Sequence, residues 1–377
     1  MRFRYGQWDG QEFSTTDRLE LFERFADFVM EYGDLALEAL EQMELSDEER
    51  EILNQLLQQG LIEKIGVRWR LTPRAVRAMQ RKALMEVFSR LGRGRREGHE
   101  TPTPGQTGER AEGTRPYQFG DPVSELDINA TLRNAITHRG PGTPLAIRES
   151  DFELYQSDGQ ATCSTVILLD MSGSMARYHR FFYAKRCAMA VCALIRQRFA
   201  QDTVDLVGFY SAAAVIPEHK LPLLMPKPVS VFDYQVRLRV RVDEADQAPQ
   251  HFTNLQMGLL QAERILRRRG GDNKQIFIIT DGQPTAHLEG DYIHLVYPPV
   301  QATALATLKE SLRISRRGIR ICTFALTDDY EYLDWVSFVD QLTRLTRGVA
   351  FYCPSGELSN CVMESYLSGR KEKTYLA

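Results

Sequence analysis

The sequence predicts an α/β protein whose second half is a doubly wound, mostly parallel sheet, preceded by a smaller helical domain. Two observations carry this prediction: short apolar, β-branched runs alternate with longer amphipathic segments, and a polar segment divides the halves. We expect strands at 163–169, 204–209, 275–280, 320–326 and 349–352, and helices at 178–200, 255–269, 303–317 and 331–346. The alternating run at 236–242 carries three arginines and is expected to be an edge strand.

The N-terminal region, 1–91, shows helical spacing over 17–42. Ser46 and Glu49 form a capping-box pattern for a second helix that ends near Gly60. A hairpin centred on Ile65-Gly66 and a helix beginning at Thr72-Pro73 follow. This order resembles part of a winged-helix module, and six basic residues could touch phosphate: Arg68, Arg70, Arg74, Arg77, Arg81 and Lys82.

Residues 92–116 are rich in Gly, Pro, Arg and Glu, so we expect a flexible linker. A connecting segment (117–160), the α/β domain (161–365) and a C-terminal tail (366–377) complete the predicted organisation.

The bulk composition excludes several classes of function. A net charge of −3 gives no global reason to expect nucleic acid or an anionic membrane as partner. The six cysteines form no CxxC pair, which favours reduced thiols. The N-terminus has no signal-peptide core, and no window approaches 18 apolar residues, so we expect a cytoplasmic protein without a membrane span.

Oxygen-bearing side chains follow the ends of two predicted strands. Asp170, Ser172 and Ser174 come directly after the first strand, and Asp281 follows the strand at 275–280. Thr253 stands just before a predicted helix. Ligands of open α/β sheets bind beyond the carboxyl ends of strands, and hard oxygens suit Mg²⁺ or Mn²⁺.

These five residues resemble the metal-ion-dependent adhesion site (MIDAS) of von Willebrand factor type A (vWA) domains, over about residues 160–365. The resemblance implies that Ser172, Ser174 and Thr253 offer hydroxyl oxygens, that Asp170 and Asp281 supply charge, and that a partner protein donates an Asp or Glu to the metal. The alternatives are a vWA domain that keeps the motif without metal, and a metal hydrolase. The motif contains no His or third carboxylate to act as general base, so we expect no catalysis.

The segment 283–300 is expected to form a hairpin or lid beside this site, and 221–248 to line the same face. His287, Glu289, Asp291 and His294 raise the question of a second metal. Their spacing fits no helix pair, and a polar loop surface is the commoner meaning of such residues.

A vWA domain behind a helical region resembles the bacterial intracellular members of the family, which work with AAA+ ATPases of the MoxR or magnesium-chelatase type. The sequence contains no GxxxxGK[ST] loop, so ATP hydrolysis would come from a partner. The leading hypothesis is therefore a metal-dependent, chaperone-like adaptor that serves metal insertion, maturation or remodelling of a protein complex. The alternative is a nucleic-acid-associated vWA protein that reads through its winged-helix-like module.

Overall fold

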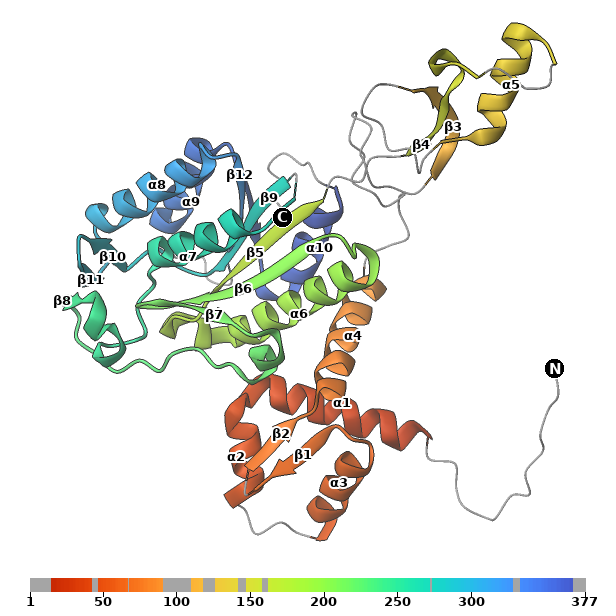
Figure 1. Cartoon of the computed structure of the whole chain (residues 1–377). Coiled ribbons are helices and arrows are strands. Elements are labelled where there is room, and N and C mark those ends of the chain that lie inside the picture. The colour runs from red at the N-terminus through yellow and green to blue at the C-terminus, as the bar shows by residue number, and fades with distance from the viewer. Residues whose placement is uncertain are drawn as a thin grey trace, which may run out of the picture.

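A six-stranded sheet with strand order β13-β12-β9-β5-β6-β7 forms the centre of the protein in the computed structural model (Figure 1). The structure describes residues 15–42, 47–66, 68–90, 110–117, 126–141, 147–157, 162–271, 273–327 and 333–368. Its strands are β5 (Cys163–Asp170), β6 (Thr203–Phe209), β7 (Ala213–Ile216), β9 (Asn273–Thr280), β12 (Ile319–Leu326) and β13 (Val349–Cys353). All neighbours pair in parallel except β6 and β7. The predicted fold class is confirmed; the short antiparallel strand β7 was not predicted.

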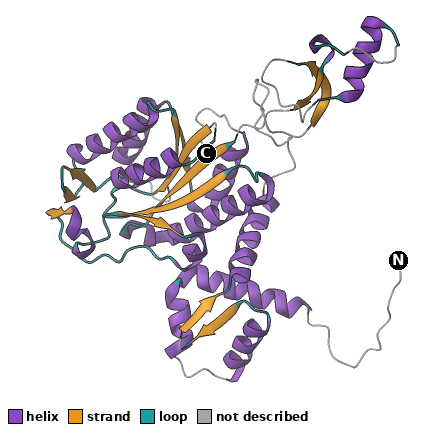
Figure 2. Cartoon of the chain, in the orientation of Figure 1, coloured by secondary structure: helices purple, strands orange, loops and turns teal. Residues whose placement is uncertain are grey.

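Helices cover both faces of this sheet, as Figure 2 shows. One face packs on α6 (Arg180–Arg198) and α10 (Leu358–Ser368), and the other on α7 (Leu255–Arg268), α8 (Gln301–Ser315) and α9 (Leu333–Thr346). Strand β5 is buried along its whole length, and its side chains alternate between the two cores. The predicted α/β domain ended at 365, whereas α10 continues to Ser368; the rest of the predicted tail lies outside the described residues.

The N-terminal module contains more helices than its sequence pattern predicts. Its elements are α1 (Thr15–Tyr32), α2 (Asp34–Gln42), α3 (Asp47–Gln58), β1 (Ile62–Ile65), β2 (Arg68–Leu71) and α4 (Pro73–Arg90). The single helix predicted over 17–42 is wrong, because Gly33 adopts a left-handed backbone (φ 59°) that separates α1 from α2. The hairpin and α4 are confirmed, with the Thr72 hydroxyl accepting a hydrogen bond from the Ala75 N–H at 3.2 Å.

This module packs directly against α6. Apolar side chains of α1, α2 and α4 belong to the same buried cluster as those of α6 and α10. Polar contacts border the cluster: Gln80 donates to Glu218 at 2.6 Å, and Arg186 pairs with Glu86 at 3.2 Å. Of the six basic residues singled out above, the five arginines are exposed, while Lys82 pairs with Asp27 at 2.8 Å inside the module.

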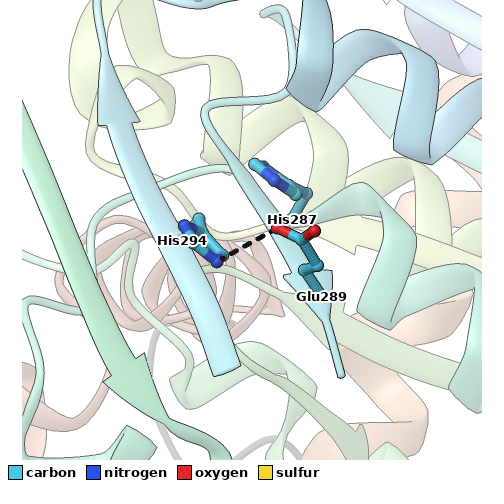
Figure 3. A group of neighbouring side chains, drawn as sticks. All are labelled: His287, Glu289 and His294. Atoms are coloured by element: carbon cyan, nitrogen blue, oxygen red, sulfur yellow. Dashed lines mark ion pairs between the residues drawn. The ribbon is translucent and has the colours of Figure 1, made fainter. Parts of the chain in front are cut away.

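A second, three-stranded sheet extends from the domain with order β10-β11-β8. The segment 283–300 forms the hairpin of β10 (Ala286–Glu289) and β11 (Tyr292–Tyr297), which confirms the hairpin prediction (Figure 3). β8 (Val236–Arg241) pairs only with β11 among the described strands, so the run of arginines is an edge strand, as predicted. Phe252 and Ala286 belong to the apolar core beneath this sheet.

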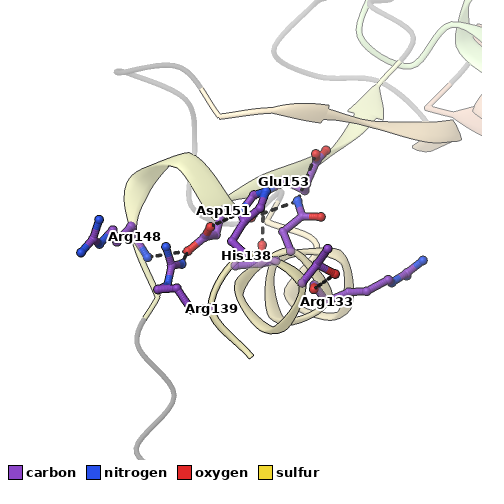
Figure 4. Close-up of polar contacts among 9 residues, drawn as sticks. Arg133, His138, Arg139, Arg148, Asp151 and Glu153 are labelled. Atoms are coloured by element: carbon purple, nitrogen blue, oxygen red, sulfur yellow. Dashed lines mark hydrogen bonds and ion pairs between the residues drawn. The ribbon is translucent and has the colours of Figure 1, made fainter. Parts of the chain in front are cut away.

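Part of the predicted linker is ordered structure. Strand β3 (Arg110–Pro116) pairs antiparallel with β4 (Glu153–Ser157), and α5 (Ile128–Arg139) packs beside them. Inside this unit the buried Asp151 carboxylate accepts from Arg139 and from the Arg148 backbone N–H (2.7 Å), and lies 2.8 Å from His138 Nδ1 (Figure 4). The linker prediction is therefore wrong for 110–116, and its remaining residues lie outside the described ranges.

Among the described helices, none combines the length and the apolar character that crossing a bilayer requires.

Candidate metal centre

The topology of the sheet brings the predicted site residues to one edge. From the central strand β5 the chain moves first to β6 on one side and later to β9 on the other, so the strand order reverses between β5 and β9. Asp170 is the last residue of β5, and Asp281 follows the last residue of β9. Crevices of this kind, at the carboxyl ends of strands where the order reverses, are the usual ligand sites of open α/β sheets.

Four predicted residues form one hydrogen-bonded group, here called the strand-end cluster: Asp170, Ser172, Ser174 and Asp281. The Ser172 N–H donates to Asp170 Oδ1 at 2.9 Å, which closes the turn after β5. The hydroxyls of Ser172 and Ser174 lie 3.1 Å apart, and Ser174 donates to Asp281 Oδ1 at 2.8 Å. The cluster therefore joins the ends of two strands that are far apart in the sequence.

Thr253, the fifth predicted residue, is held beside the cluster by its loop. The carbonyl of His251 accepts from the Gly173 N–H at 3.0 Å, which ties the loop to the turn after β5. The Thr253 N–H donates to the Thr285 hydroxyl at 2.8 Å, and its carbonyl accepts from Thr285 at 3.0 Å. The residue is buried, and these contacts fix its backbone between the cluster and the start of β10.

Burial dominates the electrostatics of the two carboxylates. Removal from water and the nearby Asp281 charge raise the pKa of Asp170 to about 7, against hydrogen bonds from Thr280 and Ser172 that favour the ionised form. Burial also raises the pKa of Asp281, although Arg180 and Ser174 oppose this. Two acids forced together out of water are a costly arrangement that a bound cation would relieve.

Two further residues contact the carboxylates and were not among the predicted ligands. The Thr280 hydroxyl, at the end of β9, donates to Asp170 Oδ2. Arg180 Nη1 donates to Asp281 Oδ2 at 2.8 Å, and both side chains are almost fully buried. Thr280 was visible from its place before Asp281, but nothing local in the sequence marks Arg180, because its contact depends on how α6 begins.

The segment between the cluster and α6 carries backbone strain. Tyr178 and His179 both have left-handed backbones, with φ values of 53° and 54°. Such conformations cost roughly 1–3 kcal/mol each for residues other than glycine and gather at functional sites. His179 lies 3.3 Å from Glu31 of α1, so the N-terminal module contacts the segment that leads away from the cluster.

Exposed aromatic side chains lie on the segment that borders the cluster. Its Val229 side chain packs against Gly173, where a Cβ atom would come within 2.6 Å of Cγ2. Further along, Phe232 and Tyr234 are 83% and 92% exposed. The prediction that 221–248 lines this face is consistent with these positions.

The donor set of the cluster fits a hard divalent cation. Carboxylate and hydroxyl oxygens are ligands of Mg²⁺ and Mn²⁺. The two carboxylates and two serine hydroxyls of the cluster, with the predicted Thr253 hydroxyl, leave room in an octahedron for water or for a further oxygen from outside. The Arg180 guanidinium donates to Asp281 Oδ2, so it offsets part of the negative charge of the cluster.

Comparisons with known proteins place this chain among relatives of unknown function. It is 28% identical over 347 residues to the uncharacterized protein Rv0959 of Mycobacterium tuberculosis (strain ATCC 25618 / H37Rv), a match that covers 90% of this chain and 47% of that protein. An uncharacterized protein of Mycobacterium bovis, Mb0984, matches with the same figures. The chain thus spans about half the length of the curated relatives it matches.

Solved structures are similar to this chain only at low identity and low TM-score. BatB from Bacteroides thetaiotaomicron has a TM-score of 0.37 and 15% identity, covering 55% of this chain and 98% of its own. The PilB minor pilin from Streptococcus sanguinis has a TM-score of 0.40 and 14% identity, covering 56% and 63%.

Two family models match the chain. The model described as "Rv0959-like protein, third domain" matches residues 109–157, the unit built on β3, β4 and α5. The model described as "Rv0959-like protein, vWA domain" matches residues 163–367, more than half of the sequence. The chain belongs to the Rv0959-like vWA family.

Proposed function

We propose that this protein is a metal-dependent protein-binding adaptor. In this proposal Asp170, Ser172, Ser174, Thr253 and Asp281 hold Mg²⁺ or Mn²⁺, and an Asp or Glu of a partner protein completes the coordination. The observation that carries it is the pair of buried carboxylates, Asp170 and Asp281, joined by serine hydroxyls at the reversal point of the sheet.

The metal part of the proposal is supported by the cost of the metal-free arrangement. A buried carboxylate whose pKa rises to about 7 either keeps a proton or takes a cation near neutral pH. The surrounding hydroxyls supply oxygen ligands that do not titrate in this range. When bound, the cation would supply a positive charge at the open edge of the sheet.

The partner part is supported by the surroundings of the cluster. Phe232 and Tyr234 stand in solvent on the segment that packs on Gly173. Aromatic side chains of this kind contribute a large share of the binding energy in many protein interfaces. A partner carboxylate on the metal, flanked by aromatic contacts, is the arrangement we propose.

The ATPase part rests on the sequence. The chain has no nucleotide-binding loop of the GxxxxGK[ST] type, so an adaptor role in remodelling, maturation or metal insertion needs a separate AAA+ ATPase of the MoxR type. The N-terminal module, packed on α6, offers that partner a further surface.

The test combines metal binding with partner capture. Calorimetric titration of EDTA-treated protein with Mg²⁺ and Mn²⁺ should show binding that Asp170→Ala abolishes and that Asp205→Ala leaves unchanged. Asp205 is a matched control because it is a carboxylate of the neighbouring strand β6, paired with Arg269 rather than with the cluster. Immobilised wild type should then capture a partner, with an AAA+ ATPase among the candidates, in Mg²⁺ and release it in EDTA. Equal capture by wild type and Asp170→Ala, with or without EDTA, would reject the adaptor proposal.

A further inference from the structure

A second group of possible metal ligands lies on the β10–β11 hairpin, apart from the strand-end cluster. His287 and His294 are directly paired across the two strands, and Glu289 follows His287 by two residues. Side chains two apart on a strand and directly opposite on its partner share one face of the sheet. One ligand atom from each of the three residues lies within 4.8 Å of the others (Figure 3).

A buried hydrogen-bond partner orients the His287 imidazole as a possible ligand. His287 is buried, and its Nδ1 lies 3.0 Å from the hydroxyl of Thr303, which is fully buried at the start of α8. When Nδ1–H donates to this hydroxyl, the lone pair of Nε2 is left for a metal. Hydrogen bonds of this kind orient metal-bound histidines in known sites. Burial and, to a lesser extent, the neighbouring His294 lower the pKa of His287, while the Glu289 charge opposes this.

The other two side chains lie within reach of the same point. The rings of His287 and His294 are nearly parallel, with centroids 5.0 Å apart. His294 Nε2 lies 3.5 Å from Glu289 Oε2, and the Glu289 side chain is 77% exposed. Ligands about 2.1 Å from a tetrahedral metal are about 3.4 Å apart. Binding therefore requires the ligand atoms, which lie within 4.8 Å of one another, to move closer, and the two stacked rings to rotate so that both lone pairs meet at the ion.

We propose that His287, Glu289 and His294 form a second metal site for a zinc-type divalent cation. Two imidazole nitrogens and one carboxylate suit Zn²⁺ or Co²⁺, whereas the all-oxygen cluster suits Mg²⁺. Three protein ligands leave the fourth position of a tetrahedron open to water or to a partner's side chain. Asp291 was the fourth possible ligand considered from the sequence. It is exposed in the turn of the hairpin and is not part of the group formed by the other three residues.

One nearby charge opposes the cation. Arg239 of β8 is paired directly with His294 of the neighbouring strand β11. The Arg239 guanidinium lies 3.7 Å from the centre of the Tyr292 ring. Removing that charge should strengthen binding, so Arg239→Gln is expected to hold Zn²⁺ at least as tightly as wild type. The cysteines compete little in the folded protein, because all six are buried.

The experiment titrates Zn²⁺ into tag-free, EDTA-treated full-length protein by calorimetry, with Mg²⁺ at saturating concentration to occupy the strand-end cluster. Co²⁺ provides a second readout, since its visible absorption reports four-coordinate binding. His294→Ala and Glu289→Gln remove ligands, and the solvent exposure of Glu289 makes its substitution safe for folding. His219→Ala, an exposed histidine on another segment, is the matched control, and Asp170→Ala tests independence from the first site.

Wild type, His219→Ala and Asp170→Ala are expected to bind one Zn²⁺ alike. His294→Ala and Glu289→Gln are expected to bind it at least ~10-fold more weakly, with the Co²⁺ bands lost. Unchanged affinity in Glu289→Gln and His294→Ala would overturn the proposal. Loss of Zn²⁺ in Asp170→Ala, or equal weakening in His219→Ala, would also overturn it, since the ion would then lie at the first site or bind without a defined site.

Discussion

At the scale of single residues, the strand-end cluster buries two carboxyl groups whose ionised forms are more stable in water. Asp170 and Asp281 are among the most buried polar side chains of the protein, and they lie on adjacent strand ends. The hydrogen bonds from Ser172, Ser174 and Thr280 satisfy some of their oxygens, and Arg180 neutralises part of the charge. Burial, which outweighs these contacts, raises the pKa of both carboxyls.

The Asp170 carboxyl should make the metal-free protein less stable as the pH rises. Its pKa is about 7 in the folded state against 3.8 ordinarily, so between about pH 4 and pH 7 the folded state holds a proton that the unfolded chain has lost. Stability therefore falls across that interval. Asp170→Asn has no such proton, so its free energy of unfolding in EDTA should gain about 1–3 kcal/mol relative to wild type between pH 5 and pH 7.

Urea unfolding of both proteins at several pH values measures this difference. With saturating Mg²⁺ above pH 7, wild type should become the more stable of the two proteins. The cation stabilises the wild-type carboxylate, and the variant has one charged ligand fewer for it. A difference that stays constant with pH would mean that Asp170 ionises normally in the folded protein.

At the scale of elements, the joint between α1 and α2 shows why contacts distant in sequence decide local structure. Gly33 has a left-handed backbone, and a Cβ atom there would come within 2.4 Å of the Leu223 carbonyl oxygen. Gly33→Ala should therefore destabilise the protein by about 2–4 kcal/mol, combining backbone strain with the displaced contact. Gly66→Ala is the matched control: its φ is also positive (67°), but it has open space, so about 1–2 kcal/mol is expected.

Urea unfolding measures both costs, and limited proteolysis should show faster cleavage of the N-terminal module in Gly33→Ala alone. If the two variants lose the same stability, then the contact between Gly33 and the 221–225 segment contributes nothing to docking.

The same dependence on distant contacts separates what the sequence predicts from what it does not. The strands ending at Asp170 and Asp281 were predictable, because buried parallel strands are local apolar runs and their carboxyl ends meet at one edge. The strand at 110–116 was not, because its polar composition favours a linker and its partner lies beyond α5. His287, Glu289 and His294 were compared with helical spacing, whereas they meet by the cross-strand register of a hairpin. Arg180 reaches Asp281 only through the folded start of α6.

At the scale of the whole molecule, three parts converge on one edge of the large sheet. The strand-end cluster lies at the edge itself, the N-terminal module contacts the segment after it through Glu31 and His179, and the second sheet begins beside Thr253. Phe232 and Tyr234 stand on the segment between the cluster and β8. The cluster, the segment with the exposed aromatic residues and the N-terminal module are thus joined by direct contacts.

The two aromatic residues provide a test that separates partner binding from metal binding. Replacing both, Phe232→Ala with Tyr234→Ala, removes large exposed rings and should leave the Mg²⁺ affinity unchanged, because neither ring contributes an oxygen to the cluster. Capture of the Mg²⁺-dependent partner should weaken at least ~10-fold, the loss expected when an aromatic anchor worth more than about 1.4 kcal/mol is truncated. Surface plasmon resonance with the captured partner measures this.

Leu345→Ala is the control for that comparison. Leu345 is an exposed apolar residue of α9, a helix on the face of the large sheet opposite to α6. It should bind the partner as wild type does. Full partner affinity in the double aromatic variant would place the interface elsewhere on the domain, while loss of both partner and Mg²⁺ would mean that the 226–235 segment supports the cluster itself. We expect the double aromatic variant to lose the partner and to keep Mg²⁺. This result would mean that the aromatic residues bind the partner and do not help to hold the metal.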